Sequence, residues 1–82
     1  MKTIEVLGPG CNNCRRVEAN AREAVAIVGV EAEIIHVTDP RDIVGRGILS
    51  TPGVIIDGRI RSYGRVPSAG DIAAWLSEPT VT

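Results

Sequence analysis

Short alternating patterns and a longer helical pattern of hydrophobic positions follow one another along the first half of the chain. Residues 2–7 (KTIEVL) place Ile and Val at alternate positions, which predicts a strand. Over residues 11–28 apolar side chains recur every three or four positions, which predicts a helix with one buried stripe, made of Cys14, Val17, Ala21, Ala24, Val25 and Val28. Residues 31–37 (EAEIIHV) predict a second strand, and the strand–helix–strand order favours a parallel crossover.

Turn and capping signals divide the next part of the chain into shorter elements. Asp39-Pro40 suits the N-cap and first position of a short helix. Residues 53–57 (GVIID) predict a third strand. The Asp57-Gly58 pair is typical of a two-residue hairpin turn, which leads into a fourth strand at residues 59–63.

A capping box marks the last predicted helix. Ser68 is followed three residues later by Asp71, and the helix after it is expected to bury Ile72, Trp75 and Leu76.

The element order that these patterns predict is β-α-β-α-β-β-α. It predicts an α/β sandwich with a four-stranded mixed sheet flanked by helices. We expect one domain over residues 1–78 and a frayed tail over residues 79–82.

Composition and charge narrow the possible functions. The 82 residues are 44% hydrophobic and carry a net charge of −1, with basic and acidic residues interleaved. The basic stripe of a nucleic-acid-binding protein is therefore missing. The longest apolar run, Ala24–Val30, is far shorter than the roughly 20 residues that span a bilayer, and no signal-peptide pattern opens the chain. We expect a cytoplasmic monomer that binds neither nucleic acid nor membranes.

The stretch GPGCNNCRR holds both cysteines of the chain, Cys11 and Cys14, at the start of the long predicted helix. At this spacing the two side chains fall on nearly the same side of a helix, with α-carbons about 5–6 Å apart, within disulfide range. Unpaired backbone N–H groups, the helix dipole and Arg15 all favour a thiolate at Cys11 and so lower its pKa. Cys14 lies one turn deeper on the apolar stripe. We therefore expect an accessible nucleophile followed by a shielded thiol.

Two observations leave alternatives open at this point. Zinc sites also contain C-x-x-C, but a closed site needs four ligands, and His36 is the one other strong soft ligand in the chain. His36 lies within the second predicted strand, where we expect a structural or surface role.

Thr51-Pro52 directly precedes the third predicted strand, where a proline cannot donate to the sheet ladder. Either a cis Thr51–Pro52 bond or an ordinary trans proline at a strand entrance accounts for it.

Taken together, these motifs resemble the thioredoxin superfamily. GPGCNNC follows a first strand and STPGVIIDG comes about forty residues later, as in the small single-domain thioredoxin/glutaredoxin-like redox proteins of prokaryotes. The resemblance covers residues 2–76 and implies a thiol–disulfide oxidoreductase that needs no cofactor besides its redox-active disulfide. It implies that Cys11 attacks a partner disulfide, that Cys14 resolves the mixed disulfide, and that Pro52 is a cis-proline packed against the active site.

The resemblance also implies a substrate-binding surface made of Thr51, Pro52, Gly10 and Gly64. The backbone of Thr51 would pair with a bound peptide, and Gly64 opens the loop that helps to hold glutathione in glutaredoxin-like members. The implied partners are protein disulfides and an unidentified reductase. Glutathione is a weaker candidate, because only Ala69-Gly70-Asp71 echoes its binding motif.

The residues between and after the cysteines depart from the family pattern. Asn12 and Asn13 stand where thioredoxins carry Gly-Pro and typical glutaredoxins carry Pro-Tyr. Together with Arg15, they are expected to modulate the reactivity of the two thiols.

Two rival functions and one surface feature also follow from the sequence. Residues 11–18 and 29–31 resemble heavy-metal-associated domains, and two thiolates suit Cu(I). Such soft-metal carriers usually have Met where this chain has Pro9, and they do not account for Thr51-Pro52. A thioredoxin-like interaction module whose disulfide acts as a sensor is the second rival.

A group of arginines at residues 59–65 is expected to protect a strand edge from association, or else to face an anionic partner.

Overall fold

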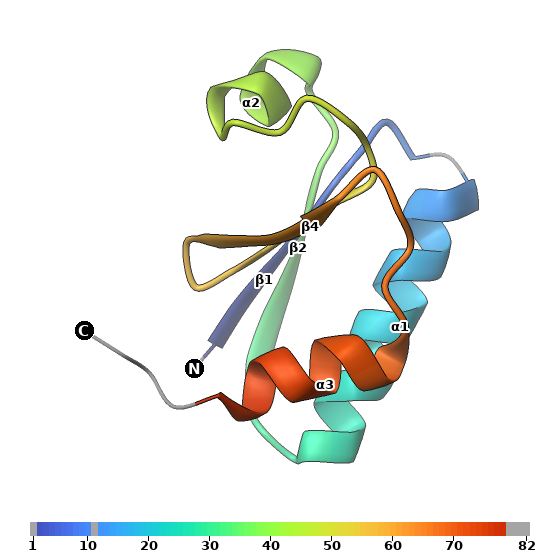
Figure 1. Cartoon of the computed structure of the whole chain (residues 1–82), viewed down its shortest axis with the longest axis vertical. Coiled ribbons are helices and arrows are strands. Elements are labelled where there is room, and N and C mark those ends of the chain that lie inside the picture. The colour runs from blue at the N-terminus through green and yellow to red at the C-terminus, as the bar shows by residue number, and fades with distance from the viewer. Residues whose placement is uncertain (1, 11, 79–82) are drawn as a thin grey trace.

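The computed structural model describes residues 2–10 and 12–78, which form seven elements in the order expected from the sequence (Figure 1). The strands are β1 (Lys2–Leu7), β2 (Ala32–Val37), β3 (Gly53–Ile56) and β4 (Arg59–Tyr63). The helices are α1 (Asn12–Val28), α2 (Pro40–Gly45) and α3 (Ala69–Ser77). The predicted start of the first helix at Cys11 and the predicted fraying of residues 79–82 lie outside the described residues.

The four strands form one mixed sheet in the order β2-β1-β3-β4. β1 pairs in parallel with β2, from Lys2 opposite Ala32 to Leu7 opposite Val37. β1 also pairs antiparallel with β3, and β3 antiparallel with β4, where the register shifts between Val54/Ile55. This topology confirms the α/β class with a four-stranded mixed sheet. It also places β1 in the interior of the sheet, with its carboxyl end leading into the cysteine motif.

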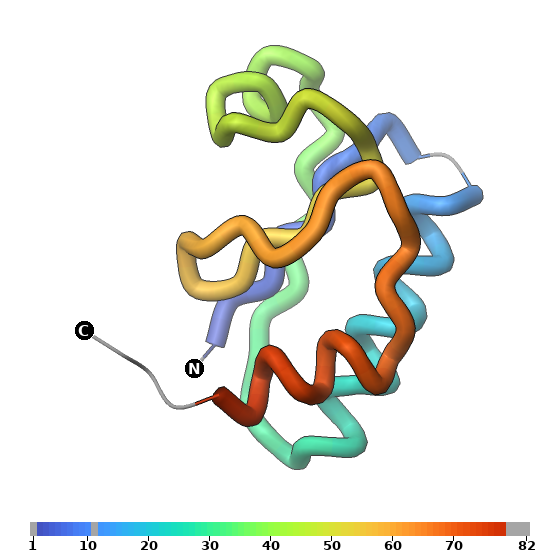
Figure 2. The backbone as a smooth tube through the Cα atoms, viewed as in Figure 1, coloured from blue at the N-terminus to red at the C-terminus, as the bar shows by residue number. Residues whose placement is uncertain are grey.

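Alternate residues of β1 and β3 face two separate apolar clusters. α1 and α3 pack on one face of the sheet and form the larger cluster, made of Ile4, Val6, Val17, Ala21, Ala24, Val54, Ile56, Ile72, Ala73 and Leu76. α2 and the segment after it pack on the opposite face and form the smaller cluster, made of Leu7, Val37, Ile43, Ile48 and Ile55. Figure 2 shows the corresponding arrangement of the chain, with α2 set apart from α1 and α3.

The capping and turn residues indicated by the sequence are present. The carboxylate of Asp39 accepts a hydrogen bond from an N–H group in the first turn of α2, and Ser68 with Asp71 forms the capping box of α3. At the Asp57-Gly58 turn both residues have positive φ angles, 49° and 83°, as a type I′ hairpin requires. The N–H of Thr3 donates to the Asp57 carboxylate at 2.9 Å, which fixes this turn against β1.

Trp75 departs from the prediction that it anchors the core. It is only half-buried and packs at the margin of the larger cluster, whereas Ala73 is buried. At 100° per residue, Trp75 lies about 100° around α3 from the centre of the stripe formed by the buried residues Ile72, Ala73 and Leu76. β3 also ends one residue earlier than predicted, because Asp57 already adopts the left-handed conformation of the turn.

Candidate active site

Cys14 lies in the first turn of α1, and its side chain is fully buried, at 0% exposure. Its sulfur packs against the residue that follows β1, because a Cβ built on Gly8 would overlap the Cys14 Sγ. The same Cβ would lie 3.8 Å from the Cβ of Thr51, so the strand end, the helix and the Thr51 loop meet around the sulfur. Cys11, the predicted nucleophile, lies outside the described residues.

The loop before β3 contains a cis Thr51–Pro52 peptide bond. Thr51 is exposed and Pro52 is buried. The N–H of Gly64 donates to the carbonyl of Pro52 at 3.0 Å, which ties the end of β4 to this loop. Gly64 has a φ of 74°, and a Cβ there would lie 3.2 Å from the Cβ of Ser50, so both conformation and space favour glycine. Two of the predicted substrate-binding residues are thus joined by a hydrogen bond.

The predicted modulating residues lie on the exposed side of the first turn of α1. Asn12, Asn13 and Arg15 are all exposed, whereas Cys14 is directed into the interior. Gly10 precedes the helix with a φ of 88°, a left-handed conformation that favours glycine, and apart from its chain neighbours no described residue has an atom within 4 Å of the position of a Cβ there. The turn therefore presents polar side chains to solvent while it buries the Cys14 thiol.

An apolar groove of about 270 Å³ lies beside Thr51. Pro9 and Thr51 line it together with residues of α2 and the segment after it, Pro40, Ile43, Val44, Ile48 and Leu49. The walls face solvent, because the side chains of Val44 and Leu49 are 60% and 85% exposed. The groove therefore offers apolar side chains to solvent beside Thr51.

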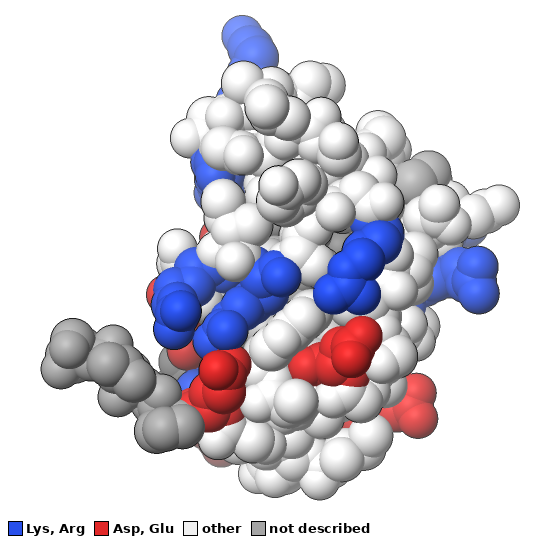
Figure 3. Space-filling model, in the orientation of Figure 1, with Lys and Arg blue, Asp and Glu red and all other residues white. Residues whose placement is uncertain are grey.

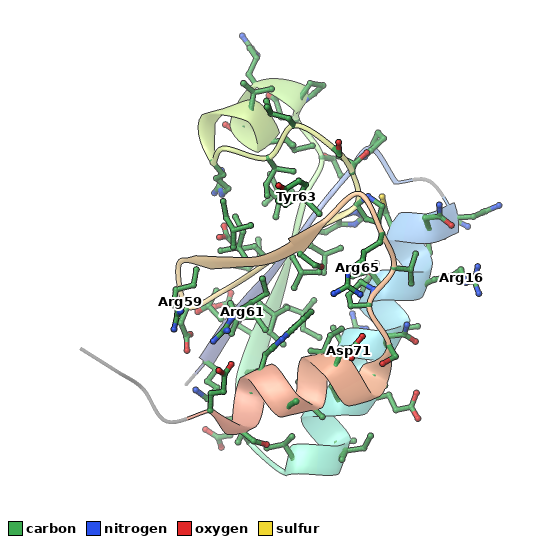
Figure 4. The ribbon with its side chains drawn as sticks, viewed as in Figure 1. Arg16, Arg59, Arg61, Tyr63, Arg65 and Asp71 are labelled. Carbon is green, nitrogen blue, oxygen red and sulfur yellow. The ribbon has the colours of Figure 1, made fainter. Side chains whose placement is uncertain are left out.

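The arginines of residues 59–65 form a band across the surface over β4 and the loop that leads to α3 (Figure 3). Arg61 pairs with Glu78 at 2.7 Å, and Arg65 pairs with Asp71 at 3.6 Å. Figure 4 shows Arg59 and Arg61 side by side on β4, with Arg65 above Asp71. Since two of these three guanidinium groups face carboxylates of the α3 segment, the band offers little uncompensated charge to an anionic partner.

The remaining chemical candidates give no second site. His36 is exposed on β2, in agreement with the predicted surface role. Within residues 2–10 and 12–78, no group of three or more His, Cys, Asp or Glu side chains is arranged to hold a metal ion. In the same part of the chain, none of the helices combines the length and the apolar character that crossing a bilayer requires.

Comparison with known proteins identifies the family. A family model described as a thioredoxin domain matches residues 2–77. A thioredoxin of Methanothermobacter thermautotrophicus is 39% identical over 77 residues, which cover 94% of this chain and 100% of that protein. The chain belongs to the thioredoxin family. A thioredoxin of Methanocaldococcus jannaschii is 38% identical over 72 residues, which cover 88% of this chain and 83% of that protein.

Membership of the thioredoxin family decides between the two families that the sequence resembles, thioredoxins and heavy-metal-associated domains. Thioredoxins are thiol–disulfide oxidoreductases, so the chain belongs to a class of enzymes that interconvert dithiols and disulfides. The resemblance to a heavy-metal-associated carrier is not favoured, because the thioredoxin match extends over β3, β4 and α3, which a carrier does not account for.

Gly8 and the groove wall formed by Pro9 were not among the predicted site residues. Both residues belong to GPGCNNC, but their contacts depend on how α1 and α2 pack against the sheet. A signal for Gly8 was available, because the motif contains two glycines. Gly10 already supplies the left-handed conformation before the helix, so Gly8 requires a different explanation.

Proposed function

We propose that the protein exchanges electrons with disulfides of partner proteins through Cys11 and Cys14. The Cys11 thiolate attacks one sulfur of the partner disulfide and expels the other as a thiolate, which leaves a mixed disulfide. The Cys14 thiolate then attacks the Cys11 sulfur, releases the reduced partner and forms the intramolecular disulfide. A reductase returns two electrons, and two protons from solvent restore the dithiol.

The position of Cys14 is the observation that carries this proposal. Its thiol is buried in the first turn of α1 beside the Thr51–Pro52 loop, where external disulfides cannot reach it. The C-x-x-C spacing nevertheless predicts a separation from Cys11 that a disulfide can span. A shielded thiol at this spacing suits the second, intramolecular step.

The surface beside the site supports proteins as the substrates. We propose that the exposed backbone of Thr51 pairs with a partner peptide between Gly10 and Gly64, and that the adjoining groove takes an apolar side chain of the same peptide. Glutathione is less well supported. Asp71, from the partial glutathione motif, already accepts the Ser68 N–H at 3.2 Å.

The setting of this chemistry is part of the proposal. One domain over residues 1–78 would act as a monomer in the cytoplasm. Reductases there keep dithiols reduced, so the intramolecular disulfide would form only transiently during turnover. Asn12, Asn13 and Arg15, exposed around the first turn of α1, would then adjust the reactivity of the two thiols.

Serine substitutions at the two cysteines test the proposal through reduction of insulin disulfides by the wild-type chain and its variants. Cys11→Ser should abolish turnover, because the attacking sulfur is lost. Cys14→Ser should still attack but accumulate a mixed disulfide, visible as a dithiothreitol-sensitive mass increase, because nothing resolves it. Ala26→Ser introduces the same hydroxyl at an exposed position near the other end of α1 and should retain wild-type turnover. Full turnover by Cys11→Ser would show the assignment to be wrong.

A further inference from the structure

We infer that Gly8 is a positioning residue for the resolving thiol. The inference rests on the proposed function of Cys14 and adds the residue that holds its sulfur in place. A Cβ on Gly8 would occupy the position of the Cys14 Sγ, whereas it would lie 3.4 Å from the Cys14 Cβ and 3.8 Å from the Thr51 Cβ, both ordinary contact distances. Among the described residues, the conflict is therefore with the Cys14 sulfur.

Backbone conformation does not account for glycine at this position. The N–H of Gly8 donates to the carbonyl of Val37 at 2.9 Å, which continues the pairing of β1 with β2. The φ angle of Gly8 is outside the left-handed region that excludes other residues, unlike that of Gly10 at 88°. Alanine could adopt the backbone conformation of residue 8. What excludes a side chain there is the space taken by the sulfur.

A methyl group at residue 8 would force the sulfur to move. The Cys14 side chain has one torsion, so its sulfur can move only by rotation to another staggered position. Rotation to it displaces the sulfur by about 3 Å, more than the length of an S–S bond, about 2 Å. The resolving thiol would then be misaligned for attack on the Cys11 sulfur.

The test separates attack from resolution in a single turnover. The reduced chain reacts with a substoichiometric amount of dithiobis(nitrobenzoate), a symmetrical aromatic disulfide. The Cys11 thiolate releases the first thionitrobenzoate and forms a mixed disulfide. The Cys14 thiolate attacks the Cys11 sulfur, releases the second and closes the intramolecular disulfide. The protein loses two electrons, the reagent gains them, and the two thiol protons pass to the buffer.

In Gly8→Ala we expect the rate of the first thionitrobenzoate release to stay within about twofold of the wild-type rate. The rate of the second release should fall by about tenfold or more. Ile56→Val is the control for lowered stability, because it removes a methyl group from the larger cluster at the other end of β3 and should leave both rates near wild type. The positioning role would be overturned if Gly8→Ala released the second thionitrobenzoate at the wild-type rate, or if it slowed both releases equally. Absence of the second release in the wild-type chain would instead contradict the proposed function.

Removing the sulfur provides a second test, which holds even where Gly8→Ala alone does not fold. In a Cys14→Ala background the overlapping atom is gone, so adding Gly8→Ala should leave the melting temperature close to that of Cys14→Ala. The same substitution should lower the melting temperature clearly when Cys14 is present. If Gly8→Ala lowers the melting temperature as much in the Cys14→Ala background as it does when Cys14 is present, another group crowds residue 8 and the inference is wrong. The same conclusion follows if the double variant fails to fold.

Discussion

At the start of α3, the hydroxyl oxygen of Ser68 accepts the Asp71 N–H at 3.0 Å, and the Asp71 carboxylate accepts the Ser68 N–H at 3.2 Å. These bonds satisfy two backbone groups that have no helical partner. Ser68→Ala should therefore lower the free energy of unfolding by about 1 kcal/mol, measured by urea denaturation. Ser77→Ala is the control, because the Ser77 hydroxyl only donates to a carbonyl of the same helix, that of Ala73, at 2.9 Å. Equal losses in the two variants would contradict the capping explanation.

Single residues with a purely local role could be predicted, and those whose role depends on a packed neighbour could not. Asp39 and the Asp57-Gly58 turn act on the backbone beside them, so the adjoining sequence is sufficient. The role of Gly8 depends on the direction of the Cys14 sulfur, which the fit of α1 against β1 determines. Trp75 has helical spacing from the core residues, but the other buried side chains place the centre of the stripe away from it.

The β3–β4 hairpin depends on the turn at Asp57-Gly58. An alanine at residue 58 would have to hold a φ of 83°, a left-handed conformation that costs an L-residue roughly 1–2 kcal/mol. Gly58→Ala should lower the free energy of unfolding by about that amount, as measured by thermal or urea denaturation. Gly45→Ala is the control, because its φ is not positive, no described atom outside its chain neighbours and its own helix backbone lies within 4 Å of the added Cβ, and alanine favours the helix. Its stability should be unchanged or higher, and equal destabilisation would exclude the turn as the cause.

Elements were predicted to within a residue or two, but their arrangement required the structure. Alternation along β1 marks Ile4 and Val6 as one face, yet it does not reveal that α1 and α3 share that face while α2 lies on the other. The groove follows from this arrangement, since it combines Pro9, Thr51 and α2. The cysteine motif was therefore recognisable in the sequence, whereas the surface that would receive a partner was not.

Two unequal clusters hold the whole molecule together. The larger joins both long helices to the sheet, and the smaller attaches α2 and the segment after it to the opposite face. Ile43 is the one residue of α2 that is buried. Arg46 adds an ion pair with Glu5 at 2.9 Å, but both side chains are partly exposed, and such pairs contribute about 1 kcal/mol or less. A wall of the groove is thus weakly attached to a firm sheet.

Hydrogen exchange should therefore distinguish α2 from β1. The N–H groups of Ile43 and Arg46 donate to carbonyls one turn earlier, at 3.0 Å and 3.1 Å, so both are protected while α2 is folded. We expect them to exchange by local opening at least about tenfold faster than the paired amides of β1, with a weak dependence on denaturant. Ile43→Ala should speed exchange in both α2 and β1, because Ile43 loses its contacts in the local opening and in global unfolding alike. Ile72→Ala, in the larger cluster, should speed exchange in β1 and leave α2 nearly unchanged, because Ile72 stays packed while α2 opens. If α2 and β1 exchange at one rate with one denaturant dependence, the groove wall opens only when the whole molecule unfolds, and the weak attachment of α2 is contradicted.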